Sequence, residues 1–232
     1  PDYLMAELDG SLARLGVDHV DLYYMHRYDR SQSPEELGEV LKGLIASGKT
    51  RAVGLSEVAP STLRRVAAVC PVAAVQSEYS LSTRAPELGL VQACAEVGAL
   101  LVAFSPVGRT FLTDRPFTLN QVDTIPFLRG NPRFIDPNYS ANIKATDGFR
   151  ALAADMGISA AGLAIAWTRA KAAHVLPIPG TKNIAHLAEL LEGCARDLGD
   201  EDLARIEAVL PVGWAHGDRY NDVQWRGPER YS

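Results

Sequence analysis

The chain has 232 residues, of which 47% are hydrophobic and 22% are charged, with a formal net charge of −5 and a pI near 5.6. This composition is typical of a globular chain with ample material for a core. The acidic balance, together with the lack of a basic cluster interleaved with aromatic residues, argues against a nucleic-acid partner.

The cysteines and the apolar runs indicate where the protein works. Cys70, Cys94 and Cys194 are odd in number and widely spaced, so they form neither a disulfide framework nor a metal site. Neither Cys nor His residues cluster with ligand spacing, and we expect no metal. No apolar run reaches the roughly 18–20 residues that span a bilayer, and PDYLMAELDG at the N-terminus has no signal-peptide layout. We therefore expect a cytoplasmic protein with no membrane partner.

Strands and helices are predicted to alternate along most of the chain. Strands are expected at 20–26, 51–56, 72–77, 100–105 and 174–178, the fourth of which, LLVAFS, has the continuous apolar character of a buried parallel strand. Apolar residues at helical spacing predict helices at 2–15, 34–47, 60–69, 87–97, 143–156, 159–171, 184–193 and 201–209. Residues 108–142 exceed the usual loop length and are predicted to be irregular, and either functional or partly mobile.

This alternation predicts an α/β fold with a parallel sheet and right-handed crossovers. No strand is followed by a G-x-G-x-x-G turn, which makes a dinucleotide fold of the Rossmann type a weak alternative. The length is close to the roughly 250 residues of an α/β barrel. Five strands that begin in mid-pattern with a helix are typical of the later part of an eight-stranded barrel. We expect one domain over residues 1–232.

His26 is the first candidate for chemistry. It ends the apolar run VDLYYMHR, at the carboxyl end of a predicted parallel strand, where α/β barrels place their catalytic groups. A histidine in this position is, by itself, more often a hydrogen-bonded structural residue. In the same way, Ser56 and Gln76 would be ordinary polar groups at strand ends, and Phe104 would be a core residue.

Five ordered motifs strengthen the case for a functional role of these residues, because together the motifs resemble the aldo-keto reductase superfamily. They are GSLARLGVDHVDLYYMHR (10–27), GKTRAVGLSEV (48–58), AAVQSEYSL (73–81), AFSPVGRTFLT (103–113) and LPIPGTKNIAHL (176–187). The GLSE and QSEYS forms resemble the bacterial and plant branch that reduces aldehydes and ketones with NADPH. The resemblance implies a (β/α)8 TIM barrel, with this chain supplying strands four to eight and the C-terminal helices and loop.

The resemblance also implies a reaction. In this family a hydride passes from the nicotinamide to a carbonyl carbon while a tyrosine, tuned by a lysine and an aspartate, protonates the oxygen. A histidine orients and polarises the carbonyl, and His26 matches it. The other three groups belong to strands that would precede this sequence, since Tyr23, Tyr24 and Tyr28 do not match the motif.

Activity would require those three residues, so two alternatives stay open. The chain could be a truncated or catalytically inactive nucleotide-binding regulatory subunit. It could also be a barrel fragment that covers its two open sheet edges by oligomerisation, and the oligomeric state itself is not predicted. The expected substrate is a small carbonyl compound, whose identity the sequence does not indicate.

The resemblance assigns cofactor contacts along the strand ends. Ser56 and Glu57 match the pair that binds the nicotinamide carboxamide, and Gln76 matches a glutamine on the same amide. Phe104 matches the aromatic residue that stacks on the nicotinamide ring. The loop that follows the pyrophosphate is matched by Ser105, Pro106, Val107, Gly108 and Arg109.

A second group of contacts is implied before a late helix. Gly180, Thr181 and Lys182 resemble a turn that grasps phosphate at a helix N-terminus. Thr181 and Lys182 suit an adenosine 2′-phosphate and therefore NADPH rather than NADH. His186 lies where relatives often carry an arginine, and Leu190 replaces an asparagine that usually holds the adenine.

Overall fold

The computed structural model describes residues 2–232, and the chain divides into two compact units. Unit 1 comprises residues 2–77, 87–102 and 227–232, and unit 2 comprises residues 78–86 and 103–226. The C-terminal residues 227–232 therefore pack with the N-terminal part of the chain, although they follow the whole of unit 2 in sequence. The expectation of a single domain over residues 1–232 stays a prediction.

Five strands form one sheet in the order of the sequence, which confirms the predicted α/β class and all five predicted strands. They are β1 (Val20–Met25), β2 (Thr50–Ser56), β3 (Val72–Glu78), β4 (Leu100–Phe104) and β5 (Val175–Ile178). The pairs β1–β2 and β2–β3 are parallel. The structure contains one sheet of five strands. It does not support the expectation that these strands are the fourth to eighth of a barrel.

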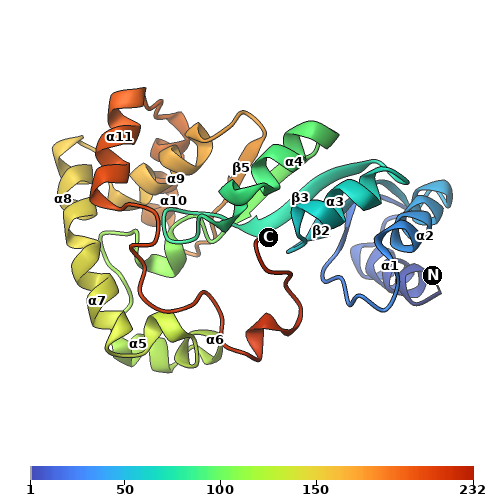
Figure 1. Cartoon of the computed structure of the whole chain (residues 1–232), viewed down its shortest axis with the longest axis horizontal. Coiled ribbons are helices and arrows are strands. Elements are labelled where there is room, and N and C mark those ends of the chain that lie inside the picture. The colour runs from blue at the N-terminus through green and yellow to red at the C-terminus, as the bar shows by residue number, and fades with distance from the viewer. Residues whose placement is uncertain (1) are drawn as a thin grey trace. The chain divides into compact units, whose positions relative to one another are not determined.

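Unit 1 carries α1 (Asp2–Leu15), α2 (Pro34–Ala46), α3 (Pro60–Ala67) and α4 (Leu90–Val97), with α3 packed against both α2 and α4 (Figure 1). The start of α2 is encoded locally. The Ser33 hydroxyl accepts from the Glu36 N–H at 3.2 Å while the Glu36 carboxylate accepts from the Ser33 N–H at 2.7 Å. This capping box satisfies two amides that the helix cannot pair, and Leu41 and Leu44 of the same helix are buried.

Unit 2 is built around α9 (Ala160–Ala170), whose residues from Ala160 to Thr168 are all buried. Helix α9 packs against α10 (Ile184–Ala195) and β5, while α8 (Asp147–Asp155) contacts both α9 and α11 (Asp200–Val209) (Figure 1). The helices α9 and α10 approach closely at two glycines. A Cβ at Gly193 would collide with the Gly162 carbonyl oxygen and lie 2.8 Å from its carbon. Only glycine fits at this crossing.

The prediction of an irregular segment at residues 108–142 was wrong. That stretch contains the short helices η2 (Gly108–Thr110), α5 (Leu119–Asp123), α6 (Pro126–Arg129) and η3 (Pro132–Phe134), and α7 (Asn138–Ala145) begins in it. Helices of three to five residues are too short to produce a 3.6-residue pattern of apolar positions. Two further 3-10 turns, η1 (Ala85–Leu88) and η4 (Gln224–Arg226), were missed for the same reason.

Within residues 2–232, no helix is by itself long and apolar enough to cross a membrane. The segments Asn138–Asp155 and Ala160–Ala170 pass a test of length and composition only as a pair, and they are bent by 89° at their junction. The second of them is α9, the buried helix at the centre of unit 2.

The close crossing of α9 and α10 predicts a large effect for a single methyl group. Gly193→Ala should lower the free energy of unfolding by about 2 kcal/mol, because two backbones must separate to admit the Cβ. Gly43→Ala is the control, since Gly43 lies in α2 and an added Cβ meets nothing within 4 Å. That variant should be stabilised by up to about 1 kcal/mol. Urea unfolding measures the free energy of unfolding of both variants. Equal changes in the two variants would contradict the close approach of α9 and α10 at Gly193.

Candidate functional site

The carboxyl ends of β1, β2 and β3 bring together five residues of unit 1, which we call the strand-end cluster: His26, Arg27, Ser56, Glu57 and Gln76. In the parallel register, Met25 pairs with Leu55 and Ser56 pairs with Gln76, so the ends of all three strands meet at the same edge. The four residues of this cluster that the sequence predicted therefore lie on neighbouring strand ends. Arg27, the fifth, was not predicted.

Arg27 joins the first two strand ends directly. Its Nη1 donates to the His26 carbonyl oxygen at 2.6 Å and to the Ser56 hydroxyl at 2.9 Å. Ser56 is buried, and the charged donor fixes the direction of its hydroxyl lone pairs. The hydroxyl proton of Ser56 can then be offered to a ligand.

The buried residue Glu57 is held through its backbone. Its N–H donates to the Gln76 carbonyl oxygen at 2.9 Å, and its own carbonyl oxygen accepts from the Glu229 N–H at 2.8 Å. Glu57 adopts a φ of 55°, in the left-handed region that residues with a side chain seldom occupy. The surrounding hydrogen bonds therefore maintain a strained turn at the end of β2.

Positive φ values recur at predicted site residues. Besides Glu57, they occur at Ser105 and Arg109, and also at Thr110, in the loop that follows β4. Strain of about 1–3 kcal/mol for each such residue persists where neighbouring structure enforces it, and it is common at binding sites. These backbone positions support the sequence-based choice of both loops.

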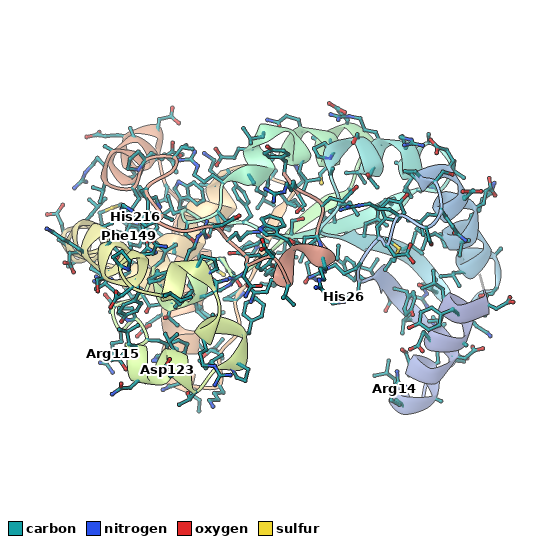
Figure 2. The ribbon with its side chains drawn as sticks, turned by 60° about the horizontal axis from the view of Figure 1, so that its bottom comes forward. Arg14, His26, Arg115, Asp123, Phe149 and His216 are labelled. Atoms are coloured by element: carbon teal, nitrogen blue, oxygen red, sulfur yellow. The ribbon has the colours of Figure 1, made fainter. Side chains whose placement is uncertain are left out.

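His26 extends from the end of β1 and is exposed (Figure 2). Partial desolvation, and then the positive charge of the neighbouring Arg27, lower the pKa of His26 below its ordinary value. Both causes disfavour the imidazolium. A neutral imidazole at pH 7 can donate a hydrogen bond to a carbonyl oxygen without carrying a charge.

The three nearby tyrosines are not suited to donate a proton. Desolvation is the largest cause that raises the pKa of Tyr23, of Tyr24 and of Tyr28. In addition, the Tyr28 hydroxyl donates to the Gln32 carbonyl oxygen, and the Tyr24 ring packs against Gly54 of β2. A phenol that is harder to ionise is a poorer acid, which agrees with the lack of a family motif around these residues.

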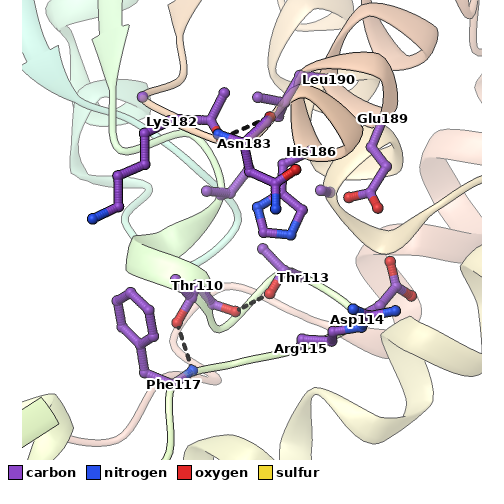
Figure 3. Close-up of a pocket in the computed structure, with 14 residues that line it drawn as sticks. Thr110, Thr113, Asp114, Arg115, Phe117, Lys182, Asn183, His186, Glu189 and Leu190 are labelled. Atoms are coloured by element: carbon purple, nitrogen blue, oxygen red, sulfur yellow. Dashed lines mark hydrogen bonds between the residues drawn. The ribbon is translucent and has the colours of Figure 1, made fainter. Parts of the chain in front are cut away.

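Unit 2 contains a cavity of about 600 Å³ at the N-terminus of α10, which we call the α10 pocket (Figure 3). One wall is the turn before α10 and the first turns of that helix: Gly180, Thr181, Lys182, Asn183, His186, Glu189 and Leu190. The other is the loop after β4, with Val107, Thr110, Thr113, Asp114, Arg115 and Phe117, and Ala161 of α9 completes the lining. Four predicted cofactor residues, Gly180, Thr181, Lys182 and His186, therefore share this cavity with Val107.

The turn into α10 is preorganised. The Asn183 side chain accepts from the Ala185 N–H at 2.8 Å as the cap of α10, and the Thr181 hydroxyl accepts from the Asn183 N–H at 3.1 Å. The positive end of the helix dipole lies at this turn. Lys182 is exposed there, and the His186 ring projects from α10 toward Thr113 and Asp114 (Figure 3). The turn therefore offers an anion the positive end of the helix dipole and the Lys182 ammonium group.

The opposite wall is held by its own hydrogen bonds. The Thr110 hydroxyl accepts from the Phe117 N–H at 3.0 Å, and the Thr113 hydroxyl donates to the Thr110 carbonyl oxygen at 2.8 Å (Figure 3). Asp114 accepts from the Ala160 N–H at 3.0 Å and thereby anchors the loop to the start of α9. The loop is therefore fixed in position although it contains little regular structure.

The apolar floor explains one departure from the family pattern. Leu190 is buried against Ala161 and Ile165 of α9, and Val107 packs against the same cluster. Leu190 thus places hydrocarbon where the resemblance implies an amide.

The remaining predicted residues of the loop after β4 lie outside the lining of the α10 pocket. Phe104 and Ser105 are half-buried at the end of β4, and Pro106 is buried. Arg109 forms an ion pair with the buried carboxylate of Glu78, and its guanidinium carbon lies 4.8 Å from the centre of the Phe127 ring. The charge of Arg109 is thus neutralised inside unit 2, and its direct role at a phosphate stays a prediction.

The sequence did not indicate several residues of the site. Arg27 stood beside His26 in the quoted motif without an assigned role. Asn183 and Glu189 flanked the predicted phosphate turn, and their helical spacing from His186 was the available signal. Thr110, Thr113, Asp114, Arg115 and Phe117 lie in or beside the segment that was predicted to be irregular. Among residues 2–232, no group of three or more His, Cys, Asp or Glu side chains is arranged to hold a metal ion.

The fold and these two sites define a class of protein, namely parallel α/β proteins with candidate binding groups at the carboxyl ends of the strands. Within that class, the sequence profile described as the aldo/keto reductase family matches residues 1–211. The chain belongs to the aldo/keto reductase family, and the resemblance noted in its motifs is confirmed.

Two curated relatives are similar over 95% of the chain. The aldo-keto reductase yakc [NADP(+)] of Schizosaccharomyces pombe is 37% identical over 223 residues, and the probable aldo-keto reductase 1 of Glycine max is 38% identical over 220 residues. The chain spans 66% and 63% of the lengths of these two proteins.

Two solved structures are also similar, each at 25% identity. The glycerol dehydrogenase AKR11B4 from Gluconobacter oxydans matches 89% of this chain and 63% of its own with a TM-score of 0.77. The thermostable aldo-keto reductase Tm1743, solved with the inhibitor epalrestat, matches 90% of this chain and 66% of its own with a TM-score of 0.71. The similarity covers most of both units of the chain.

The charge of Arg27 predicts a measurable change at His26. In Arg27→Gln the pKa of His26 should rise toward its ordinary value, because the repulsion is removed while the desolvation remains. Arg51→Gln is the control, since Arg51 pairs with Asp21 at 2.7 Å on the same two strands. NMR titration of the imidazole measures the change. A His26 pKa that falls or stays constant in Arg27→Gln would contradict this electrostatic account.

Proposed function

We propose that this protein is an NADPH-dependent oxidoreductase that reduces aldehydes or ketones to alcohols. Membership of the aldo/keto reductase family is the observation that carries the proposal. The name of the Schizosaccharomyces pombe relative supports NADP(H) as the cofactor. In the proposed enzyme, the five strands described above are the fourth to eighth of a (β/α)8 barrel.

The α10 pocket supports the choice of a phosphorylated nucleotide. Lys182, Arg115 and His186 line it beside the N-terminus of a 12-residue helix, and this donor set suits a phosphate group. We assign the adenosine 2′-phosphate of NADPH to Thr181 and Lys182. The Phe117 ring and the buried Leu190 supply apolar surface for the adenine.

The strand-end cluster of unit 1 supports the chemistry that we propose at the nicotinamide. Ser56 and Gln76 offer a hydroxyl and an amide to the nicotinamide carboxamide, and the family resemblance assigns stacking on the ring to Phe104. Bound NADPH supplies the hydride. His26, held neutral by its surroundings, donates a hydrogen bond that orients the carbonyl oxygen and stabilises the negative charge that develops on it.

Lys182 should decide the preference between cofactors. Lys182→Ala is expected to raise the Kd of NADPH about tenfold, because a charged hydrogen bond to the 2′-phosphate is lost, and to leave the Kd of NADH unchanged. Lys144→Ala is the control, since Lys144 is exposed in the last turn of α7 and lies outside the lining of the pocket. Fluorescence titration of both cofactors measures the change. Equal losses for NADPH and NADH would refute the 2′-phosphate assignment.

His26 should act on turnover rather than on cofactor binding. In the full-length protein, His26→Ala should lower kcat for aldehyde reduction about a hundredfold, as is typical when one donor to a developing oxyanion is lost, and should leave the Kd of NADPH within about twofold. Oxidation of NADPH with a panel of aldehydes and ketones measures turnover. Unchanged kcat would remove His26 from the mechanism. Tight NADPH binding without turnover of any carbonyl would favour the regulatory nucleotide-binding subunit instead.

A further inference from the structure

Helix α3 follows the strand-end cluster directly, and its first turn lacks a local cap. Ala59 is the N-cap residue and has no side chain that can accept a hydrogen bond, and Pro60 follows it. In a capping box, a glutamate at the third helical position would accept from the N-cap amide. That position is occupied here by Thr62, which is too short and not acidic.

Glu229, at the other end of the chain, provides the missing carboxylate. It accepts from the Ala59 N–H at 2.7 Å and from the Thr62 hydroxyl at 3.1 Å. Arg30 approaches the same carboxylate at 3.8 Å and donates to the Pro228 carbonyl oxygen at 3.2 Å. A carboxylate at this point also interacts favourably with the positive end of the helix dipole. The cap of α3 is thus completed by a residue 167 positions after Thr62.

Residues 227–229, which we call the tail, also contact the strand-end cluster. The Glu229 N–H donates to the Glu57 carbonyl oxygen at 2.8 Å. At Gly227 an added Cβ would lie 2.9 Å from Cδ of Arg27, so the tail backbone lies directly against the side chain that holds Ser56. The tail therefore contacts both ends of the short segment from Ser56 to Ala59: one contact is made through Arg27 and the other through the carboxylate.

We infer that Glu229 is a positioning residue for the proposed reductase: by capping α3 and binding Glu57, it holds Ser56 and the strained Glu57 turn in the orientation that binds the nicotinamide carboxamide. This inference rests on the proposed function. A left-handed φ at a residue with a side chain relaxes unless neighbouring contacts maintain it. The bond to the Glu57 carbonyl oxygen comes from the backbone N–H of Glu229, and the carboxylate anchors that backbone to Ala59 and Thr62. Without the carboxylate, this anchor is lost and the backbone bond to Glu57 is no longer held in place.

Removing the carboxylate should weaken the binding of NADPH without affecting a ligand that lacks the nicotinamide. In the full-length protein, Glu229→Ala is expected to raise the Kd of NADPH about tenfold, as the loss of a helix cap suggests. The Kd of adenosine 2′,5′-bisphosphate, which lacks the nicotinamide, should remain unchanged. Glu229→Gln retains an acceptor oxygen and should show a smaller loss. Isothermal titration calorimetry with each ligand measures these constants for the variants and for the unmodified protein.

Glu96→Ala is the matched control. Like Glu229, Glu96 is a carboxylate that contacts α3 from another segment: it lies in α4, and its carboxylate is 2.6 Å from Arg64 of α3. This variant should bind both ligands as the unmodified protein does. An unchanged NADPH Kd in Glu229→Ala would overturn the inference. Equal losses for NADPH and the bisphosphate would also overturn it, because they would indicate a general loss of structure.

Hydrogen exchange tests the inference without a cofactor. The Ala59 amide should exchange at least about tenfold faster in Glu229→Ala and at the original rate in Glu96→Ala. If Glu229→Ala does not fold, Thr62→Val removes one of the two capping contacts and should accelerate the same amide. Failure of the unmodified protein to bind NADPH would refute the proposed function alone. Unchanged exchange at Ala59 would refute the role of Glu229 alone.

Discussion

The parallel pairing of β1, β2 and β3 is the constraint on which the strand-end cluster depends. Because parallel strands start and end at the same edges, residues far apart in sequence, such as His26, Ser56 and Gln76, must meet at the carboxyl edge. No side-chain interaction is needed to bring these positions together. The side chains then add only the finer control of orientation, through the bonds that Arg27 makes to the first two strand ends.

The loops beyond the strands require a second kind of support, since regular hydrogen bonding ends there. The turn at Glu57 and the turns at Ser105 and Arg109 hold residues with side chains at positive φ. Two of these residues are secured by groups from distant parts of the chain: Glu57 by Glu229, and Arg109 by the buried Glu78. The α10 pocket follows the same rule, because Asp114 fastens its loop to the start of α9.

These two kinds of support explain what the sequence could predict. All five strands were found from short apolar runs, and the long helices from apolar residues at helical spacing. The strand-end candidates followed from the motifs at the ends of those strands. Arg27 was not found, because its role depends on a bond to Ser56, 29 positions away, that no local pattern encodes. The pocket wall at Thr113 and Phe117 was missed because the surrounding helices are too short to show a period.

The two proposed binding regions should consequently respond differently to change. In the proposed function, the α10 pocket attracts an anion through charge and a helix N-terminus, which are contributed mainly by one local segment from Gly180 to Glu189. Its affinity should therefore depend on salt, while substitutions elsewhere should affect it little. In the proposed function, the strand-end cluster binds the carboxamide through the neutral side chains of Ser56 and Gln76, and Arg27 orients the first of them. It should depend little on salt and strongly on residues that never contact the ligand, which is why distant Glu229 is the more informative position to substitute.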